Sequence, residues 1–178
     1  MLRVMSAPAP LLVRLVAHDR ALLLRCAIAP TASRLSRRGW TALTHLGSTT
    51  VTVLAAGLPW FACCALHEAS RLAMLTLVIS HAGVQVLKRS AVRSRPAGRG
   101  DVAASIREPD RYSFPSGHAT ASMAVALAYG SVFPSVAGPL LLVALAVGFS
   151  RVRLGVHYPS DVVAGQLLAA ATAGALTF

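Results

Sequence analysis

Four long stretches without a charged side chain constrain this chain more than any other feature of its sequence. No Asp, Glu, Lys or Arg occurs at residues 39–67, 72–87, 112–150 or 162–178. An apolar stretch of about 20 residues is long enough to cross the hydrocarbon core of a bilayer as a helix. The sequence therefore predicts an all-α fold, a polytopic transmembrane helical bundle.

The composition excludes two other classes of protein. The chain has 178 residues, 55% of them hydrophobic, and its 17 Lys and Arg against 6 Asp and Glu give a net charge of +11. A disordered chain has few apolar residues and many charges, whereas only 13% of this chain is charged. A nucleic-acid binder gathers its cations on one folded polar face, but these cations flank the uncharged stretches. We expect no nucleic-acid partner and expect most cations to meet anionic lipid headgroups.

The uncharged stretches divide into about five membrane spans. The third stretch is too long for one span, and Pro134 and Pro139 divide it into a helical hairpin. Residues 11–38 alternate Leu and Val with Arg, which favours an amphipathic helix at the membrane interface, or a sixth span if this helix crosses. Residues 97–111 are rich in Gly, Pro and charge and predict a loop. The predicted spans are 48–66, 69–87, 118–133, 136–149 and 160–178.

Lys88, Arg95 and Pro96 form the first of three polar clusters at the span ends. Seven residues make two helical turns, so we expect Lys88 and Arg95 on one face of a continuing helix, about 10 Å apart, with Pro96 ending it. Taken alone, the commoner explanation is a cationic helix end that reaches lipid headgroups.

The second cluster is Pro115-Ser116-Gly117-His118, directly before an apolar run. We expect Ser116 to cap that helix, and the free N–H groups of its first turn to form an anion cradle that Gly117 keeps open. Such a tetrapeptide alone is more often a helix start than a site. An ionisable His118 at the mouth of an uncharged span favours a site.

The third cluster contains Ser150, Arg151, His157 and Asp161. Pro159 suits the first position of the last helix, which places Asp161 in its first turn, within reach of His157. A carboxylate beside an imidazole fixes its tautomer and supports positive charge on the ring. Taken alone, such a pair usually caps a helix. Together, the three clusters bring cations, backbone donors and two histidines to what we interpret as a phosphoryl site.

These three motifs, in this order, resemble the signature of the type 2 phosphatidic acid phosphatase (PAP2) superfamily. All eleven positions of the motifs Lys-x6-Arg-Pro, Pro-Ser-Gly-His and Ser-Arg-x5-His-x3-Asp match. The resemblance covers roughly residues 45–178. We accordingly expect a basic amphipathic segment over residues 1–40 and a PAP2-like transmembrane domain over residues 41–178.

The resemblance implies an integral-membrane phosphatase that needs neither metal nor cofactor. His157 would attack phosphorus and form a phosphohistidine, Asp161 would orient His157, and His118 would protonate the leaving oxygen and then activate water. The phosphoryl oxygens would be held by the remaining motif residues, with Ser150 giving either a phosphate contact or local support. These residues are Lys88, Arg95, Ser116, Gly117, Ser150 and Arg151.

The substrate would be a membrane lipid phosphate: a polyprenyl diphosphate or phosphate such as undecaprenyl diphosphate, phosphatidate or phosphatidylglycerophosphate. Nothing in the sequence identifies the lipid tail. We therefore expect the chain to be a multi-pass protein of the cell membrane. With five spans, all Lys and Arg except Arg71 lie on the side of the motifs, which favours a cytoplasmic site, whereas many family members face outward.

Two other functions would also use a phosphate-binding site, and several polar residues lie outside the three motifs. A haloperoxidase that binds vanadate shares the anion site by resemblance, and a non-enzymatic lipid-phosphate binder or transporter would also bind phosphate. His81 and Gln85 lie one helical turn apart, and we expect them to hydrogen-bond inside the bundle. We expect Asp101, Glu108 and Asp110 to solvate a loop.

Overall fold

The computed structural model describes the whole chain except residues 1–10, 30, 63–64, 107–109 and 178. The described residues form seven α-helices and two short 3-10 helices, with one isolated β-bridge between Ser94 and Tyr112 and no strand. The predicted all-α fold is confirmed. The elements are α1 (Leu11–Cys26), α2 (Arg34–His45), α3 (Thr49–Gly57), η1 (Leu58–Phe61), α4 (Ala65–Ala91), η2 (Ala97–Arg99), α5 (Gly117–Val132), α6 (Pro134–Arg153) and α7 (Pro159–Thr177).

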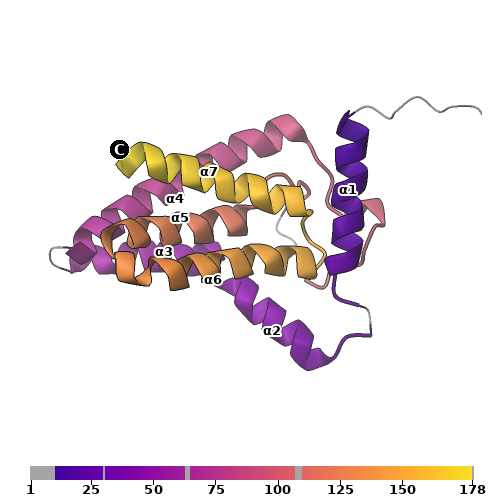
Figure 1. Cartoon of the computed structure of the whole chain (residues 1–178), viewed down its shortest axis with the longest axis horizontal. Coiled ribbons are helices and arrows are strands. Elements are labelled where there is room, and N and C mark those ends of the chain that lie inside the picture. Colours follow the sequence, from indigo (N-terminus) through magenta and orange to yellow (C-terminus); the bar gives the residue numbers. More distant parts are fainter. Residues whose placement is uncertain (1–10, 30, 63–64, 107–109, 178) are drawn as a thin grey trace, which may run out of the picture.

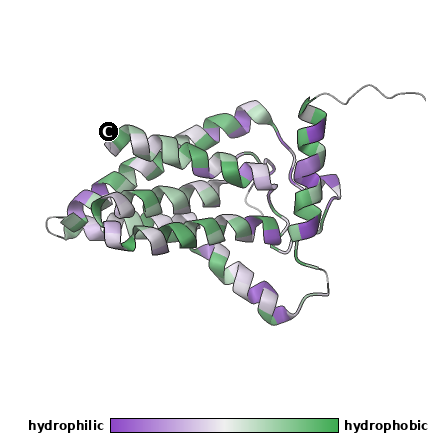
Figure 2. Cartoon of the chain, viewed as in Figure 1, coloured by the Kyte–Doolittle hydropathy of each residue, from purple (hydrophilic) through white to green (hydrophobic). Residues whose placement is uncertain are grey.

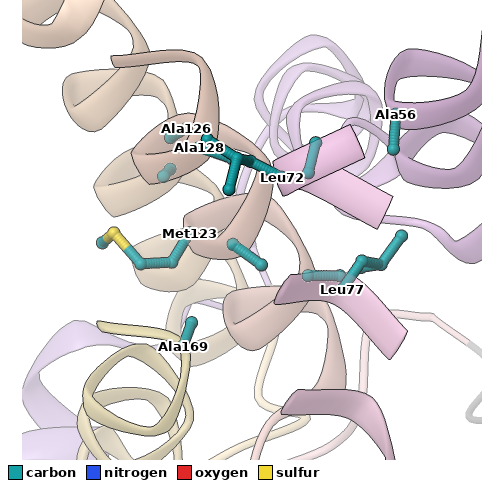
Figure 3. Packing of buried hydrophobic residues seen from close by; sticks show 11 residues of the cluster. Ala56, Leu72, Leu77, Met123, Ala126, Ala128 and Ala169 are labelled. Atoms are coloured by element: carbon teal, nitrogen blue, oxygen red, sulfur yellow. The ribbon is translucent and has the colours of Figure 1, made fainter. Parts of the chain in front are cut away.

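Helix α5 forms the centre of the bundle, in contact with α4, α6 and α7 (Figure 1). Its buried face is built from small residues, among them Ala121, Ala124 and Ala128. Figure 3 shows part of this cluster, with Ala126 and Ala128 of α5, Leu72 and Leu77 of α4 and Ala169 of α7. Small side chains let helix backbones approach closely, which is how helices associate when lipid removes the hydrophobic driving force. The central helix can therefore carry its first turn deep into the bundle.

Four of the five predicted spans correspond to observed helices, namely α4, α5, α6 and α7. The predicted span 48–66 is wrong as a single helix. Ser48 caps α3, but α3 ends at Gly57, and a 3-10 turn with Pro59 follows before α4 begins at Ala65. Proline fixes φ and has no N–H to continue the ladder. Within the described residues, two helices, α4 and α6, are long and apolar enough to cross a membrane.

Helix α1 lies across one end of the bundle, and α2 leaves that end obliquely (Figure 1). In Figure 2 hydrophilic residues gather on α1, on α2 and at the bundle ends, while the middle of the bundle is mostly apolar. Leu23 is fully buried against Ala119, Val152 and Tyr158, whereas Leu11 and Leu15 on the same helix are exposed. Helix α1 is therefore amphipathic and packs on the bundle by one face. The expectation of a single helix over residues 11–38 is wrong, because α1 ends at Cys26 and α2 begins at Arg34.

Gly47 lets the chain between α2 and α3 pass directly beside the first turn of α5. A Cβ atom at this position would lie 2.6 Å from Val147 Cγ1 and 2.8 Å from the carbonyl oxygen of His118. Real Cβ atoms do not approach a carbonyl so closely, so only glycine fits here. The α2 end is thereby held close to the end of the bundle that carries the polar clusters.

Candidate active site

A pocket of about 550 Å³ brings most of the predicted site residues together at the end of the bundle where α1 lies. It has a polar end, lined by Lys88, Arg95, Asp110, Gly117, His118, Arg151 and His157. The rest of its wall comes mostly from α3 and α4, with Thr49, Thr52, Val53, Met74, Leu77, Val78, His81, Ala82 and Gln85.

Lys88 and Arg95 reach the pocket from two different segments. Helix α4 ends at Ala91, and Val92 has a φ of 43°, a left-handed conformation that is rare for a β-branched residue. The expectation that one helix carries both Lys88 and Arg95 is therefore wrong, because the chain turns at Val92. Both side chains are nonetheless buried in the same pocket, 8% and 5% exposed.

Asp110 joins these two cations. Lys88 Nζ donates to Asp110 Oδ2 at 2.6 Å and Arg95 Nη2 donates to Asp110 Oδ1 at 3.0 Å. The expectation that Asp110 solvates a loop is wrong, and so is the same expectation for Asp101, whose buried side chain pairs with Arg20 and accepts from the Tyr158 hydroxyl. Glu108 lies outside the described residues. Burial opposes ionisation of Asp110, but the bonds and charges of Lys88 and Arg95 outweigh it and lower the pKa of this carboxyl. Asp110 therefore places a carboxylate between two cations predicted to bind phosphate.

Arg151 comes from the last turn of α6 and is 2% exposed. Its Nη1 donates to Thr44 Oγ1 at 2.9 Å, so α2 fixes the direction of this guanidinium. Sequence reasoning missed Thr44, which is a threonine in an apolar stretch 107 positions away from Arg151. No local pattern marks such a residue.

Ser116, Gly117 and His118 form the first turn of α5. The backbone N–H of Ser116 donates to the carbonyl oxygen of Asp161 at 2.9 Å, which ties α5 to α7. Ser116 occupies the predicted N-cap position of α5, but its fully buried hydroxyl makes no capping hydrogen bond and has no partner among the described residues. Gly117 and His118 line the pocket, and the nearest atom to a Cβ built on Gly117 is His81 Cε1 at 3.9 Å. The start of α5 is therefore open toward the pocket.

His157 lies in the segment between α6 and α7, 2% exposed. Its Nε2 is 3.1 Å from Arg95 Nη1, and its Nδ1 is 3.5 Å from Asp161 Oδ2. A guanidinium can only donate, so Nε2 accepts this bond and Nδ1 carries the ring proton, facing Asp161. Burial, then the charges of Arg151, Arg95 and Lys88, lower the pKa of His157 well below its ordinary value. The imidazole is neutral, with its Nε2 lone pair directed to the cations.

Asp161 occupies the first turn of α7, which begins at Pro159 as predicted, and its side chain is fully buried. Its Oδ2 accepts from the backbone N–H of Tyr158 at 2.8 Å, and its Oδ1 accepts from Arg93 Nη1 at 2.6 Å. Sequence reasoning missed Arg93. This residue stands two positions before Arg95 in a basic segment, where it cannot be told from cations that only flank a span.

Ser150 takes one of its two expected roles, whereas the pair of His81 and Gln85 lies differently from its expected place. Ser150 is fully buried and donates to the Val147 carbonyl oxygen at 2.6 Å, so its hydroxyl supports α6 and does not line the pocket. His81 and Gln85 are hydrogen-bonded at 3.1 Å as expected, but they face the pocket and not the bundle interior. In the part of the chain that the structure describes, no three His, Cys, Asp or Glu side chains cluster as a metal site requires.

Comparison with curated proteins gives relatives that act on phosphorylated lipids. The chain is 44% identical over 87 residues to the decaprenylphosphoryl-5-phosphoribose phosphatase of Mycolicibacterium smegmatis, and the matched segment covers 49% of this chain and 47% of the relative. The chain thus spans about half the length of the curated relatives it matches.

Two solved structures share the fold. The chain superposes on LpxE of Aquifex aeolicus with a TM-score of 0.75, at 22% identity, covering 99% of this chain and 100% of the other. It superposes on the transmembrane PAP2-type phosphatidylglycerolphosphate phosphatase of Bacillus subtilis with a TM-score of 0.71, at 24% identity, covering 95% and 88%. The helical bundle therefore has the same architecture as these two solved structures.

The family model of the PAP2 superfamily matches residues 69–177, the segment that carries α4 to α7 and all three predicted motifs. With more than half of its length matched and the motif side chains gathered around one pocket, this chain belongs to the PAP2 superfamily.

Proposed function

We propose that this protein is an integral-membrane lipid phosphatase that hydrolyses a phosphomonoester or diphosphate of a lipid through a phosphohistidine, without a metal. One observation carries the proposal. The pocket joins a cationic, histidine-containing end to an apolar wall that follows one face of α4. Residues spaced by three or four positions share a helix face, so the pocket follows α4 for about 21 Å, from Met74 on the apolar wall to Lys88 at the cationic end. Such a pocket suits a phosphorylated headgroup attached to an apolar chain.

In the first step the Nε2 lone pair of His157 attacks phosphorus, and the bond from phosphorus to the lipid oxygen breaks. His118 donates a proton to that oxygen, so the lipid leaves as an alcohol, or as a phosphate when the substrate is a diphosphate. The imidazole becomes positive on attack, and Nδ1, which lies 3.5 Å from Asp161 Oδ2, donates its proton into a hydrogen bond with the carboxylate.

In the second step water attacks the phosphohistidine. His118, which has given up its proton, accepts one from this water, and the phosphorus–nitrogen bond breaks to release inorganic phosphate and neutral His157. Lys88, Arg95, Arg151 and the first turn of α5 hold the phosphoryl oxygens in both steps. Ser116, with its buried hydroxyl, lies at the same turn as a further donor.

The substrate class follows from the relatives and from the pocket. The name of the mycolicibacterial relative specifies a phosphate on a polyprenyl-linked pentose. A polyprenyl phosphate or diphosphate is therefore our first substrate, ahead of phosphatidate and phosphatidylglycerophosphate. We place the protein in the cell membrane with α1 at the surface, in contact with anionic headgroups, and with the bundle from α3 to α7 within the bilayer.

Phosphate release by the detergent-purified protein tests this function. The substrates are a polyprenyl diphosphate, a phosphorylated polyprenyl-linked pentose, phosphatidate and phosphatidylglycerophosphate, each with EDTA present. We expect turnover of at least one lipid, inhibition by vanadate, and loss of turnover in His157→Ala and His118→Ala. His67→Ala is the matched control, because His67 bonds the Trp60 carbonyl oxygen near the start of α4, about 30 Å along that helix from Lys88.

Two results would contradict the proposal. Full turnover by His157→Ala would exclude the phosphohistidine, and binding of lipid phosphate without hydrolysis of any substrate would indicate a binder or transporter. Labelling of an Ala104→Cys variant from each side of sealed vesicles shows on which side of the membrane the pocket opens, because Ala104 is exposed in the loop beside it.

A further inference from the structure

The buried carboxylate of Asp161 is connected to helix α1 through Arg93. Arg93 Nη1 donates to Asp161 Oδ1 at 2.6 Å, and Arg93 Nη2 donates to Asp19 Oδ2 at 2.5 Å. The side chains of Asp19 and Asp161 are 8% and 0% exposed. Two buried carboxylates from opposite ends of the chain thus share one guanidinium, and one of them also faces His157.

Asp19 also holds the first turn of α7 directly. Its Oδ1 accepts from the backbone N–H of Ser160 at 2.9 Å, and its Oδ2 accepts from the Ser160 hydroxyl at 2.6 Å. Ser160 immediately precedes Asp161, and Arg93 Nη1 donates to the Ser160 hydroxyl as well, at 2.7 Å. An acidic side chain at a helix N-terminus satisfies free N–H groups and interacts favourably with the helix dipole. Asp19 therefore fixes both the cation that holds Asp161 and the backbone that carries it.

The sharing of Arg93 affects the strength of Asp161 as a partner for His157. Burial opposes the charge on Arg93, but Asp161 and Asp19 outweigh it and raise the pKa of this guanidinium. With both carboxylates present, Arg93 divides its hydrogen bonds between them. Without Asp19, Arg93 would pair with Asp161 alone and draw its carboxylate away from His157 Nδ1, which is already 3.5 Å from Asp161 Oδ2.

We propose that Asp19 is a positioning residue of the active site, acting through Arg93 and Ser160 on Asp161, so that helix α1 is part of the catalytic apparatus. This inference rests on the proposed function, because it requires His157 to be the nucleophile and Asp161 its partner. It extends the functional unit beyond residues 69–177, the segment that the family model matches.

Helix α1 has other anchors, which supply a matched control. Arg20 Nε lies 2.7 Å from Asp101 Oδ1, and Leu23 is fully buried against the bundle. The Arg20 side chain is 58% exposed, whereas the Asp101 side chain is 6% exposed and also accepts from the Tyr158 hydroxyl at 2.7 Å, so Asp101 keeps a hydrogen bond when Arg20 is replaced. Arg20→Gln therefore removes an ion pair of α1 next to Asp19 without touching Asp161.

The experiment compares Asp19→Asn, Asp19→Ser, Asp19→Glu and Arg20→Gln in full-length protein, with the lipid phosphate that the wild type hydrolyses. We expect the two charge-removing variants, Asp19→Asn and Asp19→Ser, to lower kcat about tenfold. Mutating the hydrogen-bond partner of a metal-ligating residue has an effect of at least this size, and Asp19 is likewise one contact removed from the reacting group. KM and the inhibition constant of inorganic phosphate should stay within about twofold, because the phosphate contacts remain. Asp19→Glu should recover part of kcat, and Arg20→Gln should match the wild type.

A double-mutant cycle with Arg93→Gln separates positioning from general docking. If Asp19 acts through Arg93, Asp19→Asn causes little further loss of kcat in that background. If Asp19→Asn does not stay monodisperse in detergent, Asp19→Ser replaces it in the double-mutant cycle.

The inference is overturned if Asp19→Asn retains the wild-type kcat, if Arg20→Gln loses as much activity, or if the loss is undiminished in Arg93→Gln. A wild type that hydrolyses no lipid phosphate would remove the proposed function and this inference together. Wild-type turnover with an unaffected Asp19→Asn variant would remove the inference alone.

Discussion

Asp110 forms an ion pair with Lys88 on the wall of the pocket, with 2.6 Å between Oδ2 and Nζ. The carboxylate lies where an oxygen of the phosphoryl group is expected, since it also accepts from Arg95. An anion that already neutralises these cations competes with phosphate for them. The pocket therefore holds its own counter-ion.

Replacing Asp110 by Asn should tighten phosphate binding. We expect the inhibition constant of inorganic phosphate to fall about three- to tenfold, because one partly exposed negative charge is removed from the two cations. Asp101→Asn is the control, since it removes the same charge from the same loop outside the pocket lining. An inhibition constant that is unchanged or higher in Asp110→Asn would show that the carboxylate organises the cations instead of competing with phosphate.

Thr44→Val should lower kcat/KM by about ten- to a hundredfold. The substitution keeps the shape of the side chain but removes the hydroxyl that accepts from Arg151 Nη1, and a hydrogen bond to a charged group contributes about 1.5–3 kcal/mol. Steady-state kinetics measures the effect. Thr172→Val serves as the control, because the Thr172 hydroxyl donates only to the carbonyl oxygen of Leu168 within α7. Equal losses in the two variants would contradict a specific role for Thr44.

Gly165→Ala should destabilise the protein and reduce its activity. A Cβ at Gly165 would lie 2.6 Å from Thr120 Oγ1 and 2.7 Å from the Ser116 carbonyl oxygen, so α7 and α5 must separate. Overpacking of this kind typically costs about 1–3 kcal/mol. Gly174→Ala on the same helix meets no atom within 4 Å and should be neutral or slightly stabilising. Thermal unfolding in detergent compares the two, and equal melting temperatures would refute the packing argument.

Acidification should destabilise the folded state through His157. Its pKa is lowered on folding, so the unfolded chain binds a proton that the folded protein rejects once the pH falls below the ordinary value of 6.5. The stabilisation is complete above that pH and is lost as the pH falls, by about 1 kcal/mol for each pH unit. Melting temperatures measured at several pH values from about 7.5 down to 5 should fall less steeply in His157→Gln. Parallel curves would contradict this assignment.

The sequence predicted those parts of the fold that depend on local pattern. Uncharged apolar runs predicted α4 to α7, and the proline at position 159 predicted where α7 begins. The break between α3 and α4 was missed, although Pro59 marks it, because hydropathy continues across the turn. The end of α4 at Ala91 was missed as well, since no proline or glycine precedes the left-handed Val92.

The sequence predicted the site residues that belong to short motifs. Lys88, Arg95, Arg151 and His157 meet in one pocket although they come from four separate segments. The side chains that orient the motif residues were not predicted. Thr44 and Arg93 act across 107 and 68 positions, and such pairings depend on how helices and loops pack and not on any local period.

Different parts of the helices line the two ends of the pocket. Most groups proposed to act on phosphate stand at the ends of α4, α5, α6 and α7, while the apolar wall between Val53 and Ala82 comes from α3 and the middle of α4. Substitutions along that wall can reshape the space for the rest of a substrate while the phosphate groups keep their places. A change of substrate in this scaffold therefore needs no change of chemistry.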